Sequence, residues 1–190
     1  YDFSRHFLER AITISFSDDS TFATCGDSRN DYDGFAAPNN FMGPALWPAT
    51  RQEFYQYGPD AANVHLDMLH SSPLCMGIAG HGGGSNYFAF NGFDGVLDYY
   101  DFGNPHPDKK YGGEDHTDGK KRRYTEVKLK RVQGIPSTMH FDSATQWLYI
   151  ADTGNQRIVR VNVTNAAPVG MLPSFPMDGT LQEFQGVIQE

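Results

Sequence analysis

The sequence predicts an all-β fold built from repeated, stacked sheets, and three observations support this prediction. The stretch from Trp147 to Val161 has the pattern of a strand, a tight polar turn and a second strand. Weaker copies of this pattern occur upstream, at 22–29 and 88–96. A hairpin of this kind does not bury its apolar face alone, so its repetition indicates sheets stacked on one another. The composition agrees, because 14% aromatic residues with 20 Gly and 11 Pro suit short strands and many turns.

The overall composition excludes two classes of protein. Hydrophobic residues make up 39% of the 190 residues and charged residues 20%, which is too apolar for a disordered chain and too polar for a membrane protein. No apolar run approaches the ~18 residues that a membrane-spanning helix needs. The sequence starts at Tyr1, without an initiator Met, so we interpret it as a mature or excised product. We expect residues 1–190 to form a single domain or part of one.

The first repeat begins with two short strands. Residues 11–16 alternate between apolar and polar and end at a turn, and 21–25 form the returning strand. Residues 27–40 are rich in Asp, Asn, Gly and Pro, which predicts a loop. The prolines in 41–48 confine that apolar segment to an edge strand or an irregular wall. Between 51 and 72 the pattern leaves both helix and strand open.

The second and third repeats are more regular. In the second repeat we expect strands at 74–79, 86–90 and 96–102, an insertion, and an outer strand at 125–132 with Val127 and Leu129 on one face. In the third repeat we expect strands at 137–142, 147–152 and 157–163. The segments at 168–172 and 186–188 are interpreted as an outer strand and the start of another repeat.

The third repeat resembles an NHL repeat of a β-propeller. The resemblance rests on Met139-His140-Phe141-Asp142 and on the run from Trp147 through Ala151-Asp152-Thr153-Gly154-Asn155-Gln156-Arg157 to Val161. It is close over 135–162, fair over 73–102 and weak over 12–47. It implies an incomplete or excised propeller with blades at 11–70, at 73–132 (insertion 103–123) and at 135–172, followed by the start of a further blade at 173–190.

In that family an Asp in the turn and an Arg after it tie the inner strands of a blade together. The resemblance places these roles on Asp152 and Arg157. The first repeat has Thr24 in place of the Asp and keeps Arg29, whereas the second repeat lacks both. Independently of the family, an Asp caps turn amides and a guanidinium offers a planar fork to acceptor groups. We therefore expect this pair to stabilise the third repeat.

The insertion between Asp101 and Arg123 interrupts the repeat, and such insertions often carry function. Its carboxylates suit Ca²⁺, and its imidazoles suit Zn²⁺. The alternative is an ordinary polar, Gly-rich loop. The candidate metal ligands are His106, Asp115, His116 and Asp118.

Charge is distributed unevenly along the chain. The net charge is −8, yet residues 109–131 contain nine basic and four acidic residues, which leaves +5 in that window and −13 elsewhere. One interpretation is a solvated loop followed by a charged strand edge. The other is a basic patch that docks on an acidic protein surface, including that of a second copy. The candidate patch is Lys120, Lys121, Arg122 and Arg123. Nucleic acid is disfavoured, because the remaining surface would repel phosphates.

Two features bear on location. Cys25 and Cys75 could pair, but the sequence leaves a disulfide and buried thiols both open. Asn162-Val163-Thr164 is an N-glycosylation sequon, which matters only in a secreted protein. Together they favour an extracellular or cell-surface location.

The leading functional prediction is a non-enzymatic extracellular binding or assembly module, with a subunit of a secreted or surface filament as a special case. No catalytic constellation is complete, and about three and a half blades leave open edges that closed propellers of four to eight blades do not have. We expect these edges to be completed by sequence beyond Glu190 or by another chain. One alternative is a metal-dependent propeller enzyme, similar to lyases or lactonases, with its site in 101–123. A second alternative is an intracellular protein-binding propeller.

Overall fold

The structure is a computed structural model, and it describes residues 11–17, 20–26, 40–55, 65–104 and 116–190. Within these ranges the fold is all-β, with fourteen strands, one short α-helix and one 3-10 turn. The strands form three sheets. Among the helices of the described ranges, none is long and apolar enough to cross a membrane.

The first sheet comes from the N-terminal part of the chain and is antiparallel throughout. Its order is β1 (Ala11–Phe16), β2 (Thr21–Gly26), β3 (Ala45–Pro48) and β4 (Asp67–Met68). The sequence did not decide between helix and strand for residues 51–72, and the structure has one of each there. A one-turn helix, α1 (Arg51–Tyr55), follows β3, and β4 is then the last strand of the sheet.

The second sheet begins as an antiparallel meander and is then widened by the C-terminal part of the chain. The meander is β5 (Cys75–Gly80), β6 (Asn86–Asn91), β7 (Val96–Asp101) and β8 (Lys120–Tyr124). Next to β8 lies β13 (Thr180–Gln185), which runs parallel to it, and β12 (Ala167–Met171) pairs with β13 at the outer edge. Six strands therefore form one sheet.

The third sheet contains the hairpin with the strongest sequence signal. It consists of β9 (Met139–Asp142), β10 (Trp147–Asp152), β11 (Arg157–Asn162) and β14 (Ile188–Gln189), all antiparallel. Residues Thr153–Asn155 form the 3-10 turn between β10 and β11, and Gln156 follows them in the left-handed conformation.

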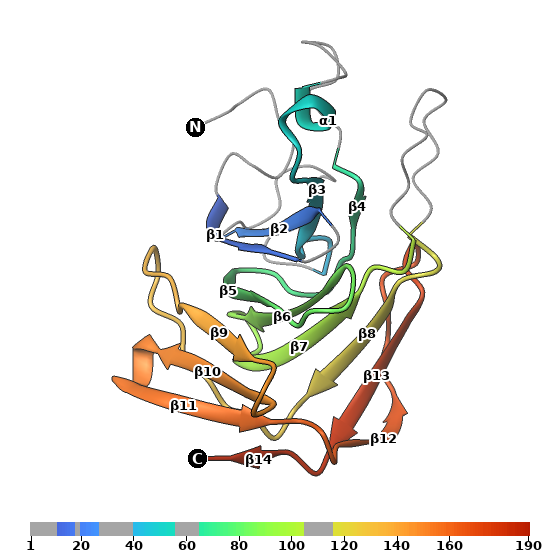
Figure 1. The fold of residues 1–190 in the computed structure, drawn as a ribbon. Helices are drawn as coiled ribbons and strands as arrows, with labels where there is room; N and C mark the ends of the chain where they lie inside the picture. The colour runs from blue at the N-terminus through green and yellow to red at the C-terminus, as the bar shows by residue number, and fades with distance from the viewer. Residues whose placement is uncertain (1–10, 18–19, 27–39, 56–64, 105–115) are drawn as a thin grey trace.

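The three sheets lie one above the other, with the first at the top of the view and the third at the bottom (Figure 1). Two buried apolar layers separate them, and the second sheet contributes to both. Each large apolar side chain buried there contributes about 1.5–3 kcal/mol. The upper layer includes Ala23, Leu46, Ile78, Tyr87, Ala89 and Tyr100. The lower layer includes Phe88, Phe90, Leu97, Leu148, Ile150 and Val159.

Three predicted strands differ from the structure, and β13 was not predicted at all. The outer strand of the second repeat is β8, which ends at Tyr124, while Val127 and Leu129 are buried in the irregular segment after it. The segment at 168–172 was expected as the outer strand of the third repeat, but β12 joins the second sheet instead. The C-terminal segment returns to pair with β11 as β14 and does not start another sheet. The division of the chain into propeller blades stays a prediction.

Candidate functional site

Two of the predicted metal ligands, His116 and Asp118, lie in the described residues, and they contact different partners. Nδ1 of His116 lies 2.5 Å from Oδ1 of the buried Asp67. Oδ2 of Asp118 accepts a hydrogen bond from the backbone N–H of Asn104, 2.9 Å away. His106 and Asp115 lie outside the described residues. Within the described ranges, no group of three His, Cys, Asp or Glu side chains is placed to hold a metal ion.

The predicted basic patch is an internal strand. Residues 120–123 belong to β8, which lies between β7 and β13. Strand alternation exposes Lys120 and Arg122 but buries Lys121 and largely buries Arg123. Even Arg122 is engaged, because its guanidinium lies 5.0 Å from the ring centroid of Tyr99. Lys121 and Arg123 therefore do not add to an exposed basic surface, and docking of the predicted patch on a protein partner stays a prediction.

The buried Lys121 belongs to a cluster of charges between the first and second sheets. Its ammonium group forms an ion pair with Asp178 and donates to Oγ of Ser71 at 3.1 Å. Oδ1 of Asp178 also lies 2.5 Å from Nδ1 of His70, and Oδ2 accepts the His70 backbone N–H at 2.9 Å. Burial lowers the pKa of Lys121, and the charge of Asp178 opposes this. Burial disfavours ionisation of Asp178, but His70 and Lys121 outweigh it and lower the pKa of that carboxyl.

Arg123 and Asp98 form a second ion pair in the same cluster. The guanidinium of Arg123 donates two hydrogen bonds of 2.8 Å to Asp98 and one of 2.6 Å to the carbonyl of Ser71. Ser72 donates to the same Asp98 carboxylate at 2.6 Å. Burial and the charge of Asp98 raise the pKa of the nearby Tyr100 hydroxyl. These paired charges bind Ser71 and Ser72 in the segment that links the first sheet to the second. We therefore interpret the cluster as structural.

Three histidines meet beside this cluster, although nothing in the sequence predicted it. The ring of His116 lies 5.6 Å from that of His70 and 6.4 Å from that of His65, measured between centroids. Phe175 stacks on His70 at 4.1 Å. His65 and His70 come from one short segment, but His116 follows them by more than 40 residues, so only the tertiary fold shows that the three rings lie together.

Asp152 and Arg157 contact each other as the resemblance implied. They are directly opposite across the β10–β11 hairpin, and Nε of Arg157 donates to Oδ2 of Asp152 at 2.8 Å. The buried carboxylate also accepts the side chain of Asn155 and the backbone N–H of Lys130, each at 2.8 Å. The pair therefore fixes the turn and joins it to the segment that enters the third sheet.

The remaining predicted residues are the two cysteines and the sequon asparagine. A disulfide joins Cys25 on β2 to Cys75 on β5 and so links the first sheet to the second. Asn162 ends β11, and its side-chain oxygen accepts the backbone N–H of Thr164 at 2.9 Å.

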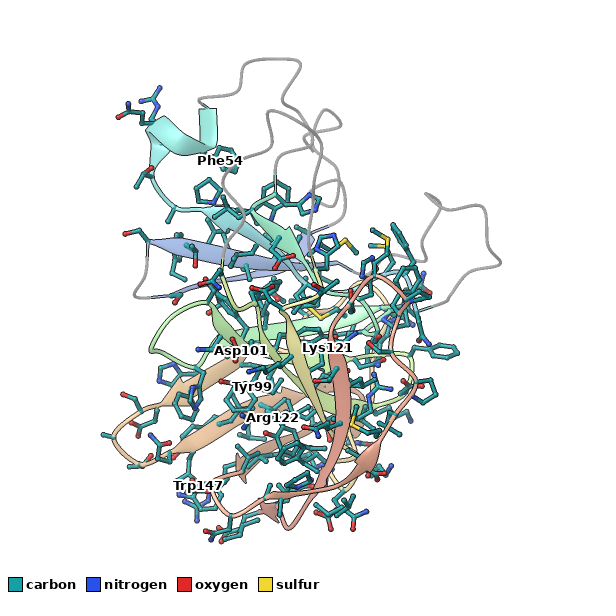
Figure 2. All side chains as sticks on the ribbon, turned by 90° about the vertical axis from the view of Figure 1, so that its right-hand side faces the viewer. Phe54, Tyr99, Asp101, Lys121, Arg122 and Trp147 are labelled. Atoms are coloured by element: carbon teal, nitrogen blue, oxygen red, sulfur yellow. A yellow bond between two sulfur atoms is a disulfide. The ribbon has the colours of Figure 1, made fainter. Side chains whose placement is uncertain are left out.

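The outer face of the third sheet is the strongest candidate for an interaction surface. On β10, Leu148 and Ile150 face the core, so Trp147 and Tyr149 point outward. On β11, Ile158 is 69% exposed on the same outward side. Figure 2 shows Trp147 below Lys121 and Arg122, toward the lower end of the stack. We call the outward side chains Trp147, Tyr149, Ile158 and Arg160 the third-sheet outer face.

Arg160 orders the aromatic part of this face. Its guanidinium lies 4.5 Å from the centroid of the Trp147 ring and pairs with the Glu190 carboxylate. A guanidinium held over an indole is favourable and keeps the ring in one orientation. Trp, Tyr and Arg side chains are enriched at the centres of protein interfaces, and this face carries one of each.

Comparisons with known proteins add one similarity. No protein-family model and no curated protein matches the sequence. Among solved structures, the chain is similar to an auxiliary nutrient binding protein from Bacteroides ovatus ATCC 8483, with 15% sequence identity and a TM-score of 0.49. The match covers 82% of this chain and 29% of that one, so the chain spans less than a third of that protein's length.

Proposed function

We propose that this chain is a non-enzymatic, extracellular binding and assembly module whose sheets are blades of an NHL-like β-propeller. The observation that carries the proposal is the third-sheet outer face. Ile158 is exposed there, directly opposite Ala151 and therefore diagonal to Tyr149, whereas the opposite side of the same sheet is fully packed. Asp142 and His140 lie opposite Trp147 and Tyr149 on the same face, so the face combines aromatic and polar side chains as protein interfaces do. Association with another protein would cover this face.

The arrangement of the strands supports the propeller part of the proposal. Each sheet contains antiparallel strands that follow one another in the chain, and the sheets stack face to face. The Asp152–Arg157 pair lies at the position that the resemblance assigns to it. In a closed propeller every blade is covered on both faces, whereas the third sheet here has an exposed outer side.

The disulfide supports the extracellular part of the proposal. Disulfides persist in oxidising compartments and are rare where glutathione keeps thiols reduced. The Cys25–Cys75 bond connects two sheets, so its formation is part of the tertiary structure. The sequon at Asn162 lies at the end of a strand, where the chain leaves the sheet.

Sedimentation velocity tests the proposed function. We expect the chain to associate as its concentration rises, and Ile158→Asp to remain monomeric because it places a charge on the third-sheet outer face. Val169→Asp is the matched control, since Val169 is 54% exposed but lies on the edge strand β12. Thermal unfolding shows whether both variants fold. A chain that stays monomeric at every concentration would contradict the assembly function.

A further inference from the structure

We infer that Asn162 is an N-glycosylation site whose glycan covers the third-sheet outer face, so that only chains without this glycan associate. This inference rests on the proposed assembly function, which then belongs to the unmodified chain, and adds its regulation by a covalent modification. It follows from the position of the sequon, because the fold places Asn162 on the side of the third sheet that association would cover.

Asn162 points to the outer side of the third sheet. On β11, Val159 and Val161 belong to the buried layer between the second and third sheets. Because side chains alternate along a strand, Ile158, Arg160 and Asn162 point the opposite way. The predicted glycosylation acceptor therefore shares one side of β11 with two residues of the third-sheet outer face.

The neighbouring strands place Asn162 between an aromatic and an apolar side chain. Leu148 on β10 is opposite Val161, so the same register brings Trp147 opposite Asn162. On the other side, Ile188 of β14 is opposite Asn162 and is 47% exposed. Directly opposite residues of an antiparallel pair have Cα atoms about 4.5–5.5 Å apart. A sugar attached to Asn162 would therefore stand between Trp147 and Ile188.

The acceptor amide is accessible for this modification. Asn162 is partly exposed, and Thr164, the other recognition residue of the sequon, is exposed. The side-chain oxygen of Asn162 accepts the backbone N–H of Thr164 at 2.9 Å. This contact engages the oxygen and not Nδ2, which is the atom that receives the glycan.

Glycosylation is a transfer to this amide nitrogen. A new bond joins Nδ2 of Asn162 to the first sugar carbon of an oligosaccharide that is carried on a lipid pyrophosphate. The bond between that carbon and the pyrophosphate breaks, the pyrophosphate leaves with the electron pair, and one amide proton is released. Sequons are modified in secreted proteins, so the proposed extracellular location supplies the setting for this reaction.

An attached glycan would prevent association through the third-sheet outer face. It is bulky and solubilising, so it would keep a partner away from the side chains beside it. The centre of a protein interface excludes water, and Trp147 and Arg160 lie next to the attachment point. The unmodified Asn162 side chain is short and is held in its turn by Thr164. Occupancy of this one site therefore sets the fraction of chains that can associate.

Two substitutions of Thr164 test the inference. Thr164→Ala abolishes the sequon and Thr164→Ser keeps it, while both retain the backbone N–H that Asn162 accepts. Both chains are secreted from a eukaryotic host, and mass spectrometry measures the occupancy of Asn162. In sedimentation velocity we expect glycosylated Thr164→Ser to be monomeric and Thr164→Ala to associate as its concentration rises.

A glycan at a different position controls for bulk alone. In the Thr164→Ala chain, the additional changes Val169→Asn and Met171→Thr create a sequon on β12, where both residues are exposed. Because β12 belongs to the second sheet, we expect this glycosylated chain to associate as Thr164→Ala does. Thermal unfolding checks that all three chains are folded.

The outcomes separate this inference from the proposed function. If Asn162 carries no glycan in the secreted Thr164→Ser chain, or if the glycosylated chain associates as strongly as Thr164→Ala, the inference is wrong while the assembly function stands. Loss of association in the chain that is glycosylated on β12 would also overturn the inference, because the position of the glycan would then not matter. If Thr164→Ala does not associate at all, the assembly function itself is overturned.

Discussion

Lys121 and Asp178 form an ion pair in which neither side chain is exposed to solvent, although 57 residues separate them in the sequence. Lys121 lies on β8, whereas Asp178 precedes β13, the strand that pairs with β8. Asp178 also contacts His70, which follows β4. This single carboxylate therefore connects the C-terminal segment to both the first and the second sheet.

Removing this carboxylate should strongly destabilise the fold. In Asp178→Ala, Lys121 stays buried without its counter-charge, so we expect a loss of about 3–5 kcal/mol in the free energy of unfolding. Glu190→Ala is the control, since it removes the exposed carboxylate that pairs with Arg160 and should cost about 1 kcal/mol or less. Urea unfolding of the two variants measures the difference. Similar losses in both would show that the buried pair has no special role.

The same carboxylate should contribute to acid sensitivity. His70 and Lys121 hold the pKa of Asp178 below its usual value against the opposing effect of burial, and the unfolded chain has a pKa of about 3.9. Its stabilising contribution is therefore present above pH ~4 and is lost as the pH falls from there through the lower folded-state pKa. Asp178→Asn should show a shallower decline of unfolding free energy below pH ~4. An unchanged pH slope would contradict this assignment.

The Asp152 carboxylate should stabilise the third sheet more than an exposed turn aspartate does. Asp152→Ala leaves the Lys130 N–H without its acceptor and removes the bonds from Asn155 and Arg157, so we expect a loss of about 3 kcal/mol. Asp142→Ala is the control, because Asp142 accepts its hydrogen bonds at an exposed turn. We expect a clearly smaller loss there, because water competes for these hydrogen bonds. Denaturant midpoints compare the two, and equal values would count against a central role for Asp152.

The Cys25–Cys75 disulfide should stabilise the stacking of the first two sheets. It links residues 50 positions apart, and the chain-entropy estimate for a loop of this length is about 4 kcal/mol. Urea unfolding with and without reductant measures this contribution. Thiol titration of the unreduced, unfolded protein should find no free thiol. Two reactive thiols would contradict the bond.

The sequence predicted the all-β class and the central hairpin because these depend on local patterns. Alternation in 147–152 and the Gly-Asn turn specify the strand faces, and the predicted contact between Asp152 and Arg157 depends on residues five positions apart. The position of β12 was not predictable in this way. Its residues 167–171 are all exposed, so they carry no apolar pattern that would distinguish the edge of one sheet from that of another.

The charge cluster escaped prediction for a similar reason. A run of four basic residues gives no apolar–polar alternation, so Lys121 and Arg123 look as exposed as their neighbours in sequence. Their burial is stabilised by Asp178 and Asp98, which are 57 and 25 residues away. The parallel pairing of β13 with β8 brings Asp178 to Lys121, and such a long-range pairing leaves no local signal.

The most direct test of the central claim, that the third-sheet outer face is an association surface, is acrylamide quenching of tryptophan fluorescence over a range of protein concentrations. The chain has two tryptophans, and Trp47 is fully buried, so quenching reports mainly on Trp147. We predict that quenching decreases as the unmodified chain associates and that it stays constant in Ile158→Asp. Quenching that is independent of concentration in an associating chain would show that the contact lies elsewhere and would contradict the claim.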